Sequence, residues 1–147
     1  MSNQTEALGV GRLLIAVYAV FAVSATARAL FQLATKFSEA PLAYSLSALS
    51  AVVYILATVA LARAEPTWLR IAWITVAFEL VGVLAIGTLS LSHPALFQHP
   101  SVWSGFGEGY AFIPLILPIL GLLWLSRARG RRILTSTAPL DNDSPRS

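Results

Sequence analysis

Four long apolar runs, separated by short polar segments, divide this chain. They cover about residues 11–35, 42–62, 68–91 and 110–126. A helix needs roughly 20 apolar residues to cross the hydrocarbon core of a bilayer, and the first three runs meet this length while the fourth comes close. Because backbone polar groups in lipid must be satisfied within the segment, the pattern predicts an all-α fold, a bundle of four transmembrane helices.

The remaining segments are polar. Residues 1–10 predict a short N-terminal tail, and residues 92–109 predict a loop between the third and fourth helices. Residues 127–147 begin with arginines and continue with polar residues and prolines, a composition typical of a disordered tail. The transmembrane domain is therefore predicted to cover residues 11–126.

The first run has a second interpretation as a signal peptide. Arg12 is followed by the apolar stretch LLIAVYAVFAV and the small residues SATA, which resemble a signal sequence cleaved near Ala27. Two features favour a retained helix: the segment before Arg12 is nearly neutral, and the apolar pattern resumes after Arg28. Whether the first helix is cleaved stays open from sequence alone.

The composition excludes several classes of protein. Hydrophobic residues make up 56% of the chain and charged residues 12%, about half the charged fraction of a soluble domain. The chain has no cysteine, so a disulfide, a thiolate nucleophile and a cysteine-bound metal are excluded. The net charge of +3 comes from arginines that flank the apolar runs. This placement indicates the lipid bilayer, and not nucleic acid, as the partner.

The distribution of positive charge predicts the orientation in the membrane. With four spans, one side of the membrane holds a single positively charged residue outside the spans, Lys36. The positive-inside rule then predicts that both termini are cytoplasmic and that the loop 92–109 is extracytoplasmic. The arginines that follow the fourth run are also candidates for contact with anionic lipid. The seven arginines on the cytoplasmic side are Arg12, Arg63, Arg70, Arg127, Arg129, Arg131 and Arg132.

Two charged residues lie deep inside apolar runs, Glu79 in the third run and Arg28 in the first. A carboxylate at this depth costs ~2.5 kcal/mol or more, so it is expected to have a partner. At 1.5 Å per residue the two residues differ in depth by ~9 Å, which two extended side chains can bridge. We therefore expect a Glu79–Arg28 pair. It is either a structural ion pair that fixes helix register or a site that responds to protons or solutes; in a third reading Arg28 reaches outward and Glu79 is protonated.

Other polar residues are expected to support this pair. Ser24 and Gln32 share a helical face with Arg28, since residues four apart are neighbours on a helix. Thr75 lies one turn before Glu79. In the second run Tyr54 belongs to a similar polar stripe, and the three stripes are predicted to face one another.

The predicted loop contains His93, His99, Trp103 and Glu108. Two histidines and a carboxylate are ligand types that zinc accepts, but the His-x5-His spacing matches no compact helical site. A solvated loop without metal or cofactor is therefore expected. The aromatic residues and glycines of 103–107 are expected to form a cap over the bundle, which is also a candidate surface for a partner.

Two stretches resemble a group of small four-helix integral membrane proteins from actinobacteria. They are ARALFQLATKFSEAPLAYSLSALSAVVY, and FELVGVLAIGTLSL through HPSVWSGFGEGYAFIPLILPILGLLWL, and the similarity covers most of residues 12–126. A weaker likeness, carried by Arg12 and Lys36, is to the DoxX-like proteins. Both resemblances imply a four-span layout, and neither supplies functional residues.

Catalytic patterns are absent from the sequence: it has no G-x-S-x-G, P-loop or H-E-x-x-H motif. Nothing in it therefore argues for an enzyme. We expect a protein of the bacterial cytoplasmic membrane that acts as a non-catalytic accessory or scaffold subunit, bound to another membrane protein or to copies of itself. The alternative is a small-solute or proton-coupled carrier that uses Glu79 and Arg28.

Overall fold

The computed structural model describes residues 3–63 and 65–136, and these residues are almost entirely helical. The predicted all-α fold is confirmed. Short 3-10 segments connect the long helices at two places along the chain. The elements are α1 (Asn3–Thr35), η1 (Phe37–Glu39), α2 (Pro41–Arg63), α3 (Pro66–Ser92), η2 (Pro94–Phe97), η3 (Ser104–Tyr110) and α4 (Ile113–Ser136).

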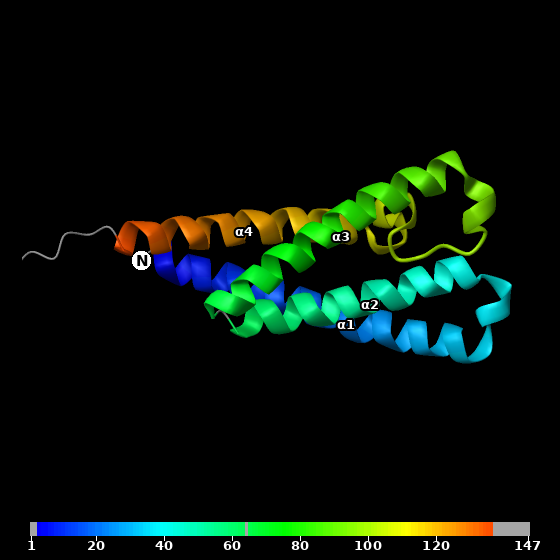
Figure 1. Ribbon diagram of the computed structural model, residues 1–147, viewed down its shortest axis with the longest axis horizontal. Coiled ribbons are helices and arrows are strands. Elements are labelled where there is room, and N and C mark those ends of the chain that lie inside the picture. The colour runs from blue at the N-terminus through cyan, green and yellow to red at the C-terminus, as the bar shows by residue number, and fades with distance from the viewer. Residues whose placement is uncertain (1–2, 64, 137–147) are drawn as a thin grey trace, which may run out of the picture.

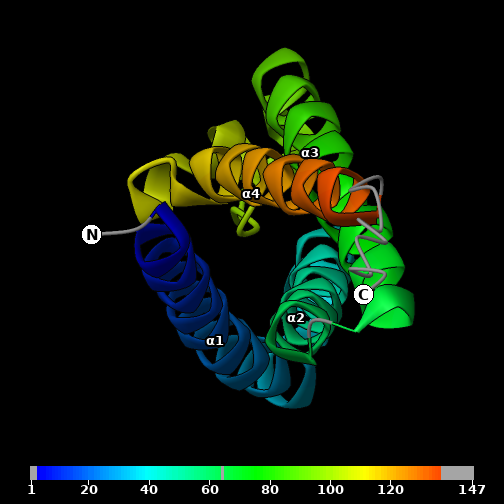
Figure 2. The same cartoon turned by 90° about the vertical axis from the view of Figure 1, so that its left-hand side faces the viewer.

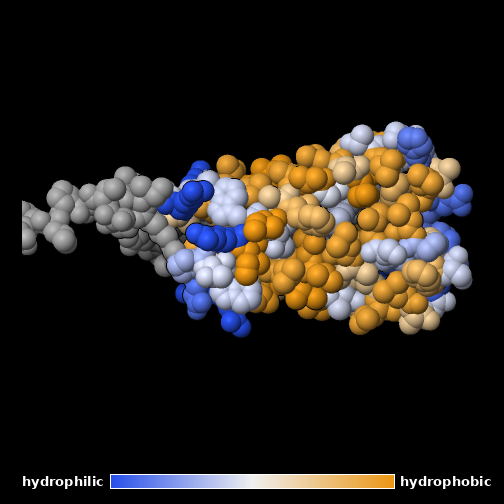
Figure 3. Space-filling view, viewed as in Figure 1, coloured by the Kyte–Doolittle hydropathy of each residue, from blue (hydrophilic) through white to orange (hydrophobic). Residues whose placement is uncertain are grey.

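All four long helices are apolar and long enough to cross a membrane. On the face seen in Figure 3, hydrophobic side chains cover the middle of the molecule and hydrophilic side chains gather toward its ends. The chain is thus a multi-pass membrane protein of the four-helix type. The spans are Gly9–Thr35, Pro41–Arg63, Pro66–Ser92 and Ile113–Arg131.

The helices α1 and α2 run side by side, while α3 leans away from them at one end of the bundle (Figure 1). The start of α1 and the end of α4 both lie at the other end of the bundle (Figure 1), on opposite sides of it when that end is viewed directly (Figure 2). We call this the terminal end, and it also holds the connection between α2 and α3. The opposite end, with the α1–α2 turn and residues 93–112, is called the loop end.

Both predicted tails are partly helical. The helix α1 already begins at Asn3, and α4 continues to Ser136, so residues 127–136 extend the fourth span in place of a disordered tail. Residues 137–147 of that predicted tail lie outside the described residues. Alanine, leucine and arginine are good helix formers, which explains why the ends of the spans continue as helix.

The segment 93–112 folds back into the bundle and fills the gap that α3 leaves when it leans away. Trp103 is 2% exposed and packs on Gly82 of α3, where an added Cβ would lie 2.8 Å from the indole. Phe106 packs still more closely on Gly87, one and a half turns further along α3. The predicted cap over the bundle is therefore wrong. Trp103 is part of the core and Phe106 is partly buried against it, because the two glycines leave room for their rings.

The backbone of this segment makes a left-handed turn. Gly105 and Gly107 have φ angles of 57° and 83°, which glycine adopts without steric cost. Phe106 has φ 60°, and this left-handed conformation costs a residue with a side chain roughly 1–2 kcal/mol. The packing of the Phe106 ring on α3 offsets this cost. The Gly105 amide donates to the Ser90 hydroxyl of α3 (2.8 Å), which satisfies a backbone group of the segment that packs on α3.

Candidate functional site

Glu79 lies near the centre of α3 and is 0% exposed. Its Oε2 atom accepts a hydrogen bond from the Tyr18 hydroxyl of α1 at 2.8 Å. Its Oε1 atom has no hydrogen-bond partner among the described residues. A carboxyl group in an apolar interior is costly unless it is hydrogen-bonded, so Tyr18 is the group that allows Glu79 to be buried here.

A second buried hydrogen bond lies beside the first. The Trp103 indole Nε1 donates to the Tyr54 hydroxyl of α2 at 3.1 Å. The rings of Tyr54 and Tyr18 pack against each other with centroids 6.3 Å apart. We call Tyr18, Tyr54, Glu79 and Trp103 the core cluster. It joins α1, α2, α3 and the segment 93–112, which we call the re-entrant loop, at one place in the bundle.

The core cluster is closed to solvent and to lipid. Tyr18 and Tyr54 are each fully buried, as are Val76 and Val83, which lie one turn to either side of Glu79 on α3. Protein interiors of this kind are packed as densely as organic crystals. The arrangement therefore stabilises the contact of four segments, and the Glu79 carboxyl is not accessible from the surface that the structure describes.

The predicted Glu79–Arg28 pair is wrong. Arg28 donates hydrogen bonds to the Tyr110 hydroxyl and to the Pro100 carbonyl oxygen (3.3 Å), and its guanidinium lies over the Tyr110 ring. Both partners belong to the loop end. A guanidinium satisfied close to the membrane surface avoids the cost of desolvation deeper in the bundle, so Arg28 points outward and Glu79 takes a neutral hydroxyl from α1.

The depths of these residues explain the change of partner. Measured along each helix from the terminal-end limits of the spans (Gly9 and Pro66), Glu79 lies at ~20 Å, Tyr18 at ~14 Å and Arg28 at ~28 Å. Tyr18 is thus nearer in depth to Glu79 than Arg28 is. The sequence does not single out Tyr18, because its neighbours on the same helical face, Leu14 and Ala22, are apolar.

The other polar residues that were predicted to support the pair do not come together at one site. Tyr54 joins the core cluster, and Thr75 is buried one turn before Glu79. Ser24 is exposed, and Gln32 is half-buried with an unpaired Oε1 atom. The prediction that three polar stripes face one another is therefore wrong: the stripe on α1 that carries Arg28 lies away from the Tyr18 face.

The loop residues do not converge on a metal site. His93 and His99 are both exposed; Nδ1 of His93 is 3.0 Å from the Ser92 hydroxyl, and the His99 ring packs near Tyr44. Glu108 is exposed as well. Among residues 3–63 and 65–136, no three metal-ligating side chains come together.

Arg28 does line a pocket of about 260 Å³ at the loop end. The pocket combines a guanidinium with a carboxylate and several hydroxyl groups. Its walls can therefore donate hydrogen bonds to an anionic group and accept them from a cationic group. The lining residues are Arg28, Pro100, Ser101, Ser104, Glu108, Gly109 and Tyr110.

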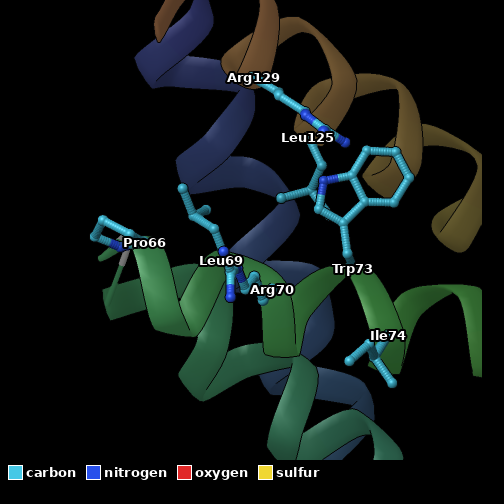
Figure 4. A pocket seen from close by; sticks show the side chains of 7 residues that line it. All are labelled: Pro66, Leu69, Arg70, Trp73, Ile74, Leu125 and Arg129. Atoms are coloured by element: carbon cyan, nitrogen blue, oxygen red, sulfur yellow. The ribbon is translucent and has the colours of Figure 1, made fainter.

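A larger groove of about 560 Å³ opens at the terminal end between the first turns of α3 and the last turns of α4 (Figure 4). Five of its residues come from α3 and two from α4, and on each helix they recur every three or four positions, which places them on one face. They are Pro66, Leu69, Arg70, Trp73, Ile74, Leu125 and Arg129.

Comparison of the chain with protein-family models, with curated proteins and with solved structures gave no match. The function is therefore argued from the residues and their geometry alone.

Proposed function

We propose that the protein is a non-catalytic accessory or scaffold subunit of the bacterial cytoplasmic membrane, with both termini in the cytoplasm. The observation that supports this is the burial of Glu79, which is 0% exposed and bonded to Tyr18. An enzyme or carrier must bring its polar groups to a substrate, whereas a scaffold needs them to hold its helices together. The core cluster suits a scaffold, since each of its four residues belongs to a different segment and the cluster holds these segments together.

The surface that we propose for a partner is the stretch 93–100 at the loop end, which is exposed except for the buried Phe97. Leu96 is 54% exposed there, between His93 and His99. The stretch is held in place because the residues that follow it, including Trp103, are anchored in the bundle. We propose that Leu96 is the central contact with a second membrane protein or a second copy of this chain, because the centre of a protein interface is apolar and its rim is polar.

Site-specific cross-linking tests this proposal. A photoreactive benzoylphenylalanine at Leu96 is expected to give one discrete cross-linked product in native membranes, with a mass that distinguishes a dimer from a complex with another protein. The same group at Ile74, which is 70% exposed on the lipid-facing side of the terminal end, is the control and is expected to give none. Cross-linking at both positions alike, or at neither, would contradict the proposal.

A second candidate function rests on the loop-end pocket. Arg28 and Glu108 line one pocket of about 260 Å³, and together they suit a small zwitterionic solute whose carboxylate faces the guanidinium. A binding or carrier role at this site would not involve Glu79. Thermal stabilisation of the purified protein by amino acids, lost in Arg28→Gln but kept in Ser24→Ala, supports this candidate; no stabilisation by any of them rejects it.

A further inference from the structure

The groove between α3 and α4 brings together two arginines, Arg70 and Arg129, with no acidic residue in its lining. Neither guanidinium hydrogen-bonds to a described residue. Two other arginines, in contrast, have a partner: Arg28 bonds to Tyr110, and Arg63 lies over the Trp68 ring at 4.9 Å. An anion that enters the groove is attracted by both of these guanidinium groups.

The rest of the groove is apolar. Each arginine has an apolar residue four positions further into the span: Arg70 is followed by Ile74, and Arg129 is preceded by Leu125. Four residues of helix rise ~6 Å, so the groove changes from charged to apolar over the thickness of a head-group layer. Trp73 lies alongside, and its indole is a side chain typical of the membrane interface (Figure 4).

We infer that this groove binds one anionic phospholipid. Its phosphate lies between Arg70 and Arg129, whose planar guanidinium groups match phosphate oxygens, and one acyl chain lies along Ile74 and Leu125. Free phosphate would use the arginines alone, and the apolar floor is what favours a lipid. The inference adds a ligand that the proposed scaffold role does not require.

Native mass spectrometry tests the inference on the full chain, purified in detergent with equal amounts of phosphatidylglycerol and phosphatidylcholine. The wild-type protein is expected to retain phosphatidylglycerol preferentially. Each arginine near a membrane surface strengthens anionic binding roughly fivefold, so Arg70→Gln with Arg129→Gln is expected to lower the retained phosphatidylglycerol roughly tenfold or more. Both side chains are exposed, so the thermal melting of the protein should stay unchanged.

Arg12→Gln with Arg127→Gln is the matched control, because it removes the same charge at the same end but outside the groove. It is expected to keep its lipid preference within about twofold. An equal loss in both double variants would overturn the inference by showing diffuse electrostatic attraction only. Displacement of the lipid by inorganic phosphate, or a preference unaffected by Ile74→Ser, would overturn it by showing that the apolar floor plays no part.

Discussion

The Tyr18 hydroxyl on α1 donates a hydrogen bond of 2.8 Å to Glu79 on α3, 61 residues further along the chain. Both residues are fully buried, and each is the other's hydrogen-bond partner. In a membrane protein the hydrophobic effect does not drive helices together, so packing and interhelical hydrogen bonds decide which helices associate and at what register. This bond fixes the depth of α3 relative to α1.

Removing the hydroxyl therefore lowers the free energy of unfolding. Tyr18→Phe keeps the ring but leaves the Glu79 carboxyl without a donor, and an unsatisfied buried group costs ~1–3 kcal/mol. Unfolding in mixed micelles by increasing fractions of a denaturing detergent measures the change. Tyr44→Phe is the control, since the Tyr44 ring is also buried but its hydroxyl has no hydrogen bond to a described residue. Equal destabilisation by the two variants would contradict a specific role for the Tyr18 bond.

A double-mutant cycle separates the partner seen in the structure from the one expected from sequence. Glu79→Gln and Arg28→Gln are expected to be additive within about 0.5 kcal/mol, because the two side chains have separate partners. Glu79→Gln and Tyr18→Phe are expected to couple by roughly 0.5–3 kcal/mol. The free energies of unfolding of the wild type, the two single variants and the double variant of each cycle give the coupling. A strong Arg28 coupling with none for Tyr18 would reverse the assignment.

The sequence predicted the four spans because length and hydropathy alone decide which segments enter a bilayer. It also identified Glu79, since a single carboxylate inside an apolar run is visible without a structure. The partner could not be read in the same way. Opposite charge favoured Arg28 as the partner of Glu79. In the structure the partner depends on depth and on the loop, where Tyr110 and Pro100 accept the hydrogen bonds of the Arg28 guanidinium. Nothing local in the sequence shows that the loop re-enters the bundle.

Because the re-entrant loop packs on the glycines of α3, adding one methyl group at these positions is expected to lower the stability of the protein. Gly87→Ala places a Cβ inside the volume of the Phe106 ring, and overpacking of this kind costs ~1–3 kcal/mol. Gly82→Ala, which meets Trp103 at 2.8 Å, is expected to act in the same direction. Thermal melting in detergent measures both changes.

Gly9→Ala is the control for these two variants. Gly9 is also helical, but an added Cβ has nothing within 4 Å, so alanine there is expected to be neutral or to stabilise the helix by up to ~1 kcal/mol. If Gly87→Ala were as stable as Gly9→Ala, Phe106 would not be packed on α3, and the loop would lie outside the bundle.

The absence of cysteine from the natural sequence makes the proposed orientation directly measurable. Single cysteines at Ala95, exposed at the loop end, and at Gly130, exposed at the terminal end, report the two sides of the membrane. Arginine side chains concentrate at the terminal end, and the positive-inside rule keeps such an end in the cytoplasm. A membrane-impermeant maleimide added to intact cells is therefore expected to label Ala95→Cys, and Gly130→Cys only after the membrane is permeabilised. The opposite pattern would place the loop end in the cytoplasm, and the surface around Leu96 would then have to meet a cytoplasmic partner.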